Sequence, residues 1–113
     1  MRKNVKIFLE HILDAINLIE DYINNKKKSD FLEFKQLQDS VIRRIEIIGE
    51  AIKNIPSDFK EYHKSIPWKE ITGMRDILIH QYFGVDLELT WEVIKTDIPN
   101  LKKQIISIKN ELE

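Results

Sequence analysis

The chain has 113 residues, 42% of them apolar and 33% charged, which suits one globular domain over residues 1–113 with a single modest core. Its formal net charge of −1 argues against a protein that coats nucleic acid with a broad basic face, but it permits a local site. Cysteine is absent, which excludes disulfides, thiolate zinc sites and a cysteine nucleophile. No apolar run approaches the roughly 20 residues that span a bilayer, so we expect a cytoplasmic protein without a membrane partner.

Apolar residues recur at helical spacing along the first half of the chain. This pattern predicts an amphipathic helix over about residues 3–24. A second helix is expected to start at Asp30, which with Glu33 resembles a capping box, and to end before Pro56. The two prolines of PSDFKEYHKSIP, residues 56–67, indicate a connector with a short helical turn.

Helical patterns continue in the second half of the chain. A third long helix is predicted from about Pro67 to Phe83, with Gly84 stopping it. Asp86 then caps a further helix to about residue 96, and Pro99 either kinks this helix or opens a last one that reaches residue 111. Since no stretch has the alternation and glycine-rich turns of a sheet, we predict an all-α, up-and-down bundle of about four to five helices.

The third predicted helix contains the segment GMRDILIHQYFG, residues 73–84. On a continuous helix His80 lies about 140° from Arg75 and points away from the core, in the same outer sector as Gly73 and Ile77. A glycine opposite the core suggests that another backbone approaches there, and a second copy of the chain is the simplest source. We therefore predict a homodimer interface at Gly73 and Ile77. The side expected to face the core carries Ile71, Met74, Leu78 and Tyr82.

Arginine and histidine together suggest phosphate chemistry. Only four of the eighteen basic residues are arginine, so Arg75 is a mild sign that the planar guanidinium is used. A guanidinium can bind a phosphate and an imidazole can move a proton, which suits metal-free RNA cleavage across a two-fold axis. Asp76, four residues before His80, is placed to orient the imidazole. The alternatives are that Arg75 is a surface cation and that Asp76 is a solvated charge.

The spacing Arg75, four residues, His80, one residue, Tyr82 resembles the signature of the HEPN superfamily, in particular its HepT branch of toxin ribonucleases. The resemblance includes the flanking stretch WKEITGMRDILIHQYFGVDLELTWEVIKTDIPNL and the segment RRIEIIGEAIKNIP at residues 43–56, so it covers most of the chain. One position differs from the family pattern. Many HEPN enzymes have asparagine directly after the arginine, whereas this chain has Asp76 there.

The resemblance implies an HEPN-like homodimer whose interface forms an RNA-cleaving cleft from Arg75 and His80 of both subunits, without a metal or another cofactor. It also implies the toxin of a type VII-like toxin–antitoxin pair, neutralised by a cognate MNT-type nucleotidyltransferase. In that family the antitoxin can transfer AMP to the motif tyrosine, here Tyr82. The helical angles instead place Tyr82 on the core side, so a plain core tyrosine stays an alternative.

Two other classes of function compete with an endoribonuclease. One is a non-catalytic substrate-binding or adaptor partner of a nucleotidyltransferase. The other is a helical dimerisation module without a site, against which stand the polar Asp76 and His80 on the predicted interface. Outside the motif, Arg43, Arg44 and Lys53 either guide RNA or form an ordinary solvated face.

Overall fold

The computed structural model describes the backbone of residues 2–80 and 84–112 and the side chains of residues 5–74, 76 and 86–112. In these residues the chain is an all-α bundle, as predicted. The elements in chain order are α1 (Arg2–Ile23), α2 (Lys28–Glu33), α3 (Lys35–Lys53), α4 (Ser57–Tyr62), α5 (Trp68–Leu78), β1 (Ile79–His80), β2 (Gly84–Val85), α6 (Leu87–Glu92), the π-helix η1 (Val93–Asp97) and α7 (Ile98–Leu112).

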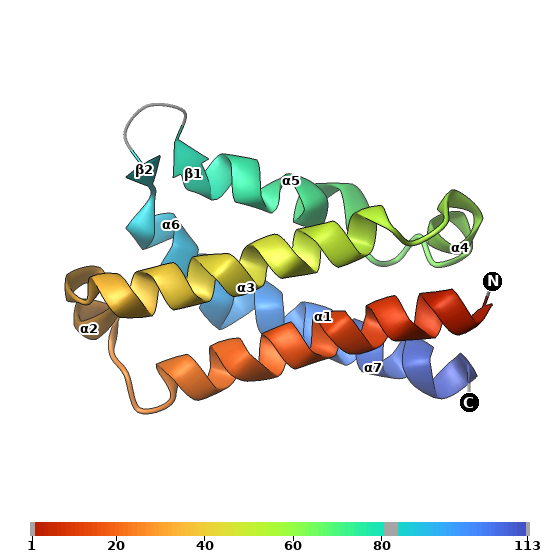
Figure 1. Ribbon diagram of the computed structural model, residues 1–113, viewed down its shortest axis with the longest axis horizontal. Helices are drawn as coiled ribbons and strands as arrows, with labels where there is room; N and C mark the ends of the chain where they lie inside the picture. The colour runs from red at the N-terminus through yellow and green to blue at the C-terminus, as the bar shows by residue number, and fades with distance from the viewer. Residues whose placement is uncertain (1, 81–83, 113) are drawn as a thin grey trace.

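The long helices run up and down the long axis of the molecule (Figure 1). Helix α1 packs against α3 and α7, and α3 also packs against α5 on its other side. The short α4 lies at the end of the bundle where α1 begins and α7 ends, whereas β1 and β2 lie at the opposite end (Figure 1). Helix α5 therefore connects the two ends of the molecule along the surface of α3.

Isoleucine and other aliphatic residues fill the core at helical spacing. In α1 the predicted stripe is fully buried at Val5, Leu9, Ile12, Ile16 and Ile19. Helices α3 and α7 present matching stripes, which include Val41, Ile45, Ile48 and Ile52, and Ile98, Leu101, Ile105 and Ile108. Burial of such side chains contributes about 1.5–3 kcal/mol each before the entropy of ordering is counted, so these three stripes hold the bundle together. No helix among the described residues is long and apolar enough to cross a membrane.

Helix α3 begins later than predicted, because the chain bends at Phe34. The Asp30 carboxylate accepts a hydrogen bond from the Lys27 N–H, 2.8 Å away, so Asp30 lies inside the first turn of α2 and does not precede it. Phe34 is extended, with φ −103° and ψ 104°. The Gln38 amide donates to the carbonyls of Phe31 and Leu32, at 2.9 and 3.2 Å, which satisfies acceptors left open at the end of α2.

The motif helix ends earlier than predicted. Helix α5 stops at Leu78 and does not reach Phe83, and residues 79–80 pair in antiparallel fashion with residues 84–85. The segment IHQYFGV, residues 79–85, is rich in β-branched and aromatic residues, which favour extended backbone over helix. Because His80 lies in β1, the angle of about 140° expected on a continuous helix does not apply to it.

The C-terminal half begins as predicted and continues with a local irregularity. Asp86 caps α6, since its Oδ1 accepts a hydrogen bond of 3.1 Å from the Leu89 N–H. Pro99 lies in the first turn of α7. Of the two predicted alternatives, a kink in the preceding helix or the start of a last helix, the second is therefore confirmed. Proline has no N–H to donate to the carbonyl of Lys95, and the π-helix η1 occupies the turn just before it.

Candidate functional site

Helix α5 carries the first part of the motif and is held by its buried face. Ile71 and Met74 are 7% and 8% exposed, which confirms the core side predicted for them. Trp68 begins the helix, is buried, and donates a hydrogen bond of 3.0 Å from Nε1 to the carbonyl of His63. The Thr72 hydroxyl donates to the carbonyl of Trp68 at 2.8 Å. The Trp68 bond ties the start of α5 to the end of α4, and the Thr72 bond lies within the first turns of α5.

The structure places the two predicted catalytic residues on consecutive elements. The backbone of Arg75 is in α5, three residues before the helix ends, and that of His80 is in β1, which follows α5 directly. His80 pairs with Gly84 across the two strands. The side chains of Arg75 and His80 lie outside the described residues, so their distance from each other stays a prediction.

The other predicted site residues are divided between described and undescribed positions. Asp76 is exposed on α5, and Gly73 is half-buried on the same helix. Ile77 is on α5 by its backbone, but its side chain lies outside the described residues. Tyr82, the predicted AMP acceptor, lies wholly outside them. Gly73 and Asp76 thus lie on one surface of α5. The roles of Ile77 in a dimer interface and of Tyr82 as AMP acceptor stay predictions.

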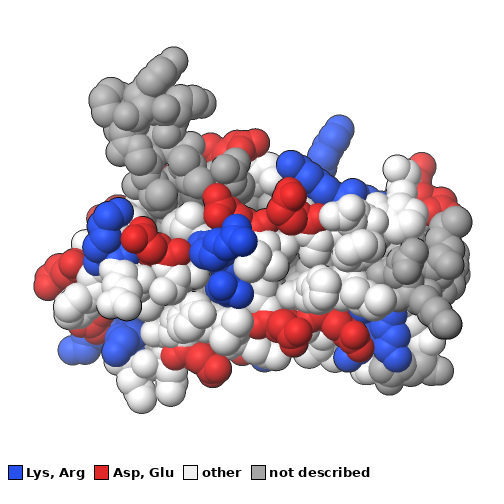
Figure 2. All heavy atoms as spheres, viewed as in Figure 1, with Lys and Arg blue, Asp and Glu red and all other residues white. Residues whose placement is uncertain are grey.

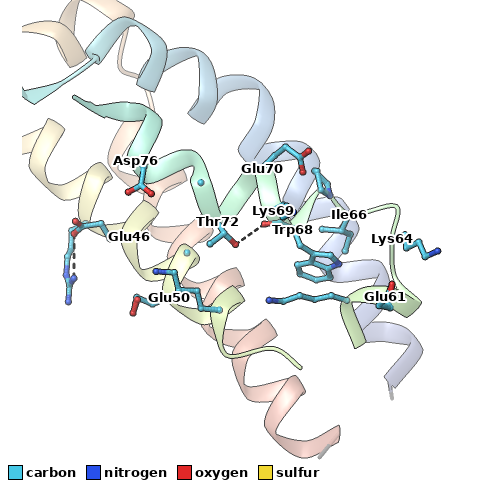
Figure 3. A pocket seen from close by; sticks show the side chains of 16 residues that line it. Glu46, Glu50, Glu61, Lys64, Ile66, Trp68, Lys69, Glu70, Thr72 and Asp76 are labelled. Carbon is cyan, nitrogen blue, oxygen red and sulfur yellow. Dashed lines mark hydrogen bonds and ion pairs between the residues drawn. The ribbon is translucent and has the colours of Figure 1, made fainter. Parts of the chain in front are cut away.

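That surface is one side of a groove with a volume of 1390 Å³ between α3, α4 and α5 (Figure 3). Gly73 and Asp76 line it from α5, and Gly49 lines it from α3. Gly49 faces the α5 backbone, since a Cβ added there would come within 3.9 Å of the Thr72 carbonyl oxygen. A Cβ added at Gly73 would meet no atom of the described residues within 4 Å. The groove is thus open beside the motif helix.

Charges of both signs line this groove. Arg43, Lys53, Lys60, Lys64 and Lys69 are basic, and Glu46, Glu50, Glu61, Glu70 and Asp76 are acidic. Asp76 and Glu46 lie at the motif end, whereas Glu61 and Lys64 lie at the α4 end (Figure 3). Arg43 pairs with Glu46 at 3.7 Å. Burial lowers the pKa of the Lys60 ammonium below its ordinary value.

The wider surface is consistent with the small net charge of the chain. Acidic and basic side chains alternate over the face shown in Figure 2, without a broad basic area among the atoms that are coloured there. Any nucleic-acid contact on this face must therefore be local. Among the residues that the model describes, no group of three or more His, Asp or Glu side chains could hold a metal ion.

Several groove residues were not predicted as part of a site. Lys60, Lys64 and Lys69 come from α4, the following loop and α5, so no spacing pattern in the sequence unites them. Lys53 and Arg43, two of the basic residues for which RNA contact was one alternative, do line the groove. Arg44 does not line the groove, and its Nε is buried without a hydrogen-bond partner among the residues that the structure describes.

Comparison with known proteins identifies the family. The model of the family "Ribonuclease HepT-like" matches residues 12–108, which is most of the chain. A "Probable ribonuclease HepT" of Thermococcus cleftensis is 53% identical over 102 residues, covering 90% of this chain and 93% of that protein. A "Putative RNase" of Caldanaerobacter subterraneus subsp. tengcongensis is 44% identical over 106 residues, covering 94% and 95%. No solved structure matches the chain significantly.

A longer relative is also similar over the whole of this chain. It is a "Gamma-glutamylcyclotransferase and putative RNase" of Methanocaldococcus jannaschii, 63% identical over 113 residues, and the chain spans 51% of its length. The all-α fold and these matches define the class to which the chain is similar, a family of helical proteins that are named ribonucleases. The chain belongs to the HepT-like ribonuclease family of the HEPN superfamily.

Proposed function

We propose that this protein is a metal-independent endoribonuclease that acts as a homodimer, with Arg75 and His80 of both subunits forming the cleft. The observation that carries the proposal is the position of the family's motif: Arg75 is in the last turn of α5, and His80 follows in β1. Arg75 lies in the helix that is anchored at Trp68, and the strand with His80 follows that helix directly.

The reaction proposed is an internal transfer at phosphorus. His80 takes the proton from a ribose 2′-hydroxyl, and the 2′-oxygen attacks the adjacent phosphorus. The bond from phosphorus to the 5′-oxygen breaks, and that oxygen receives a proton from the partner subunit's His80. Arg75 stabilises the negative charge that develops on the phosphoryl oxygens. The products are a 2′,3′-cyclic phosphate and a 5′-hydroxyl end.

The proposed dimer interface is the face of α5 around Gly73 and Ile77. A glycine in the middle of a helix is destabilising by about 0.5–1 kcal/mol relative to alanine, so its presence calls for a compensating role. The open space around Gly73 supports close approach of another backbone, because no described atom lies within 4 Å of a Cβ added there. Two-fold pairing on this face would bring together the motif ends of two chains.

The biological role that fits this enzyme is that of a toxin in a type VII-like toxin–antitoxin pair. We propose that a cognate MNT-type nucleotidyltransferase neutralises it by transferring AMP to Tyr82, in the cytoplasm. The support for this step is the resemblance of the motif, in which Tyr82 follows His80 by two residues. An added AMP would bring a bulky anion near the cleft and compete for Arg75.

A second candidate function is that of a substrate-binding or adaptor partner of a nucleotidyltransferase, without catalysis. The observation in its favour is the acidity of the groove at the motif end, where Glu46, Glu50 and Asp76 lie. Such carboxylates repel an RNA phosphate, which would weaken a ribonuclease but not a protein contact. The two functions differ in whether the purified chain cuts RNA by itself.

The experiment that tests the proposal is cleavage by purified protein with single substitutions. His80→Ala and Arg75→Ala should each reduce cleavage of RNA by at least about 100-fold, since general acid–base catalysis alone contributes typically about 10²–10⁴-fold. The matched control is His11→Ala, because His11 is an exposed histidine on α1, outside the motif. Cleavage by His80→Ala at the rate of the parent chain would refute the assignment, and absence of cleavage by the parent chain would favour the adaptor function.

A further inference from the structure

Asp86 directly follows β2, the second strand of the hairpin that carries His80. His80 pairs with Gly84 and Ile79 pairs with Val85 in antiparallel register, at one end of the bundle (Figure 1). The backbone of Asp86 is extended like that of the strand, with φ −80° and ψ 95°. Paired residues share a face and successive residues of an extended chain alternate, so positions 80, 84 and 86 belong to one face of the hairpin.

The register also sets the separation of these positions. Asp86 is two residues beyond Gly84, the direct partner of His80, so it lies diagonally across the two strands from His80. Diagonal neighbours are about 7–8 Å apart, a separation that aromatic and other long side chains can bridge. Gly84 carries no side chain, so Asp86 brings a functional group to this face where the paired residue brings none.

Asp86 itself is held by the first turn of α6. Its Oδ1 accepts a hydrogen bond of 3.1 Å from the Leu89 N–H, and its carbonyl oxygen accepts from the N–H and the hydroxyl of Thr90, at 2.9 and 2.7 Å. Thr90 is fully buried, and the adjacent Trp91 packs on Phe31 of α2 with ring centroids 5.6 Å apart. A residue that orients a neighbour must itself be fixed, and these contacts fix Asp86.

Asp76 was predicted to orient His80, but the structure removes the geometric basis for that role. The prediction depends on a spacing of four residues within one continuous helix. Helix α5 ends at Leu78, so His80 is outside the helix and this spacing does not bring the two residues together. The Asp76 side chain lines the groove between α3, α4 and α5 (Figure 3).

We infer that Asp86 is a positioning residue for His80, with its carboxylate accepting a hydrogen bond from one ring N–H of the imidazole. The imidazole lies outside the described side chains, so the inference is carried by the register of the hairpin and by the fixed position of Asp86. A carboxylate has two acceptor oxygens, so Asp86 can cap α6 and accept from His80 at the same time.

This contact would serve the reaction in two ways. It selects one tautomer of the imidazole, which leaves the other ring nitrogen to take the proton from the ribose 2′-hydroxyl. It also stabilises the imidazolium that forms when the ring takes up that proton, as the carboxylate of a catalytic triad does. The inference rests on the proposed function, because it concerns the group that moves the proton there.

Charged groups on the neighbouring elements act on the same imidazole. Arg75 and Asp76 of α5 carry opposite charges, and Glu88 of α6 is paired with a lysine of α2. These contributions partly cancel at the hairpin. The carboxylate of Asp86 should therefore have the largest single effect on the titration of His80.

The test follows the titration of His80 by NMR in the full chain labelled at histidine, with His11 and His63 as internal references. Asparagine caps a helix about as well as aspartate, so Asp86→Asn should keep the fold while removing the charge. It should move the titration midpoint of His80, and the pH profile of cleavage, to lower pH. It should also reduce kcat by about 10-fold or more with little change in KM, because the imidazole loses its orientation.

Three further variants separate this role from helix capping. Asp86→Ser retains a capping side chain without a carboxylate and should behave like Asp86→Asn. Asp86→Glu restores the carboxylate and should recover at least part of the shift in midpoint. Asp76→Asn is the matched control, since it removes a carboxylate from α5, and it should shift the midpoint of His80 clearly less than Asp86→Asn does. Urea denaturation verifies that each variant is folded.

Two results would overturn the inference even if the parent chain cleaves RNA. One is a titration midpoint of His80 that is the same in folded Asp86→Asn and in the parent, and the other is a larger shift in Asp76→Asn than in Asp86→Asn. The titration does not require cleavage. If the parent chain does not cut RNA but the midpoint depends on Asp86, the proposed function fails while the contact between Asp86 and His80 stands.

Discussion

The indole Nε1 of Trp68 donates a hydrogen bond of 3.0 Å to the carbonyl oxygen of His63, and this bond joins the first residue of α5 to the residue that ends α4. Trp68 is 7% exposed, so its ring is packed as well as hydrogen-bonded. The motif helix and α4 are therefore joined at one corner of the bundle. A disturbance at Trp68 should affect both.

Trp68→Phe tests this corner. The substitution keeps an aromatic ring but removes one of two hydrogen bonds to the His63 carbonyl, which still accepts from the Ile66 N–H at 3.2 Å. It also removes part of the packing, so the free energy of unfolding should fall by about 1–3 kcal/mol. Urea denaturation followed by circular dichroism measures it. Tyr62→Phe, at an exposed ring, should stay within about 0.5 kcal/mol. Equal stability of Trp68→Phe and the parent chain would show that the corner is not held by this residue.

Asp76→Asn tests the position at which this chain differs from many HEPN enzymes. Asparagine keeps the size of the side chain and removes a negative charge from the groove beside the motif. We expect tighter RNA binding and a cleavage rate equal to or above that of the parent, because the repulsion of phosphate is relieved. Glu70→Gln, at an exposed acidic residue of the same helix, serves for comparison. A large loss of rate with unchanged binding in Asp76→Asn would instead make the carboxylate essential for orienting His80.

Gly73 offers a test of the proposed homodimer. Since a Cβ at this position meets no described atom within 4 Å, Gly73→Ala should stabilise the single chain by about 0.5–1 kcal/mol through helix propensity. Gly73→Leu should keep the fold but weaken the dimer, because its bulk occupies the space reserved for the partner backbone. Sedimentation equilibrium over a range of concentrations measures the association. A Gly73→Leu protein that associates as tightly as the parent would place the interface elsewhere.

Metal independence is tested by a chelator. If Arg75 and His80 carry the reaction, cleavage should persist in EDTA and leave 2′,3′-cyclic phosphate ends, since neither group needs a metal to act on the 2′-hydroxyl. Mass spectrometry of the fragment ends identifies the product. Loss of activity in EDTA that returns with added Mg²⁺ or Mn²⁺ would show that a metal takes part.

Control through Tyr82 is tested by co-expression with the cognate nucleotidyltransferase. The chain should gain mass in adenylate units at Tyr82 and lose RNA cleavage, because the added phosphate competes with RNA for Arg75. Tyr82→Phe removes the acceptor oxygen, so this protein should stay unmodified and active in the presence of the partner. If the partner neutralises Tyr82→Phe as well as the parent, inhibition occurs by simple occlusion.

Much of the fold could be predicted from local patterns. The buried stripes of α1, α3 and α7 follow directly from aliphatic residues spaced three and four apart, and Ile71 and Met74 face the core as expected. Asp86 caps α6 because a carboxylate at that position satisfies a free N–H without help from distant residues. The family motif is likewise a pattern of neighbouring residues. Such features depend on interactions within one or two turns of helix.

Only the tertiary structure decided where the motif helix ends and which charged residues line the groove between α3, α4 and α5. The end of α5 at Leu78 depends on pairing of residues 79–80 with residues 84–85, and the bend at Phe34 depends on the Gln38 amide reaching back to α2. Four lysines that line the groove come from separate segments, so their shared place in the groove arises from packing of α3, α4 and α5. Periodicity determined which residues are buried because burial of a helix face is a local repeat. It could not determine which lysines of α3, α4 and α5 share the groove, because that proximity appears only once the helices have packed. The bend at Phe34 and the pairing of residues 79–80 with 84–85 are local, but they depend on specific hydrogen bonds that hydrophobic periodicity does not report.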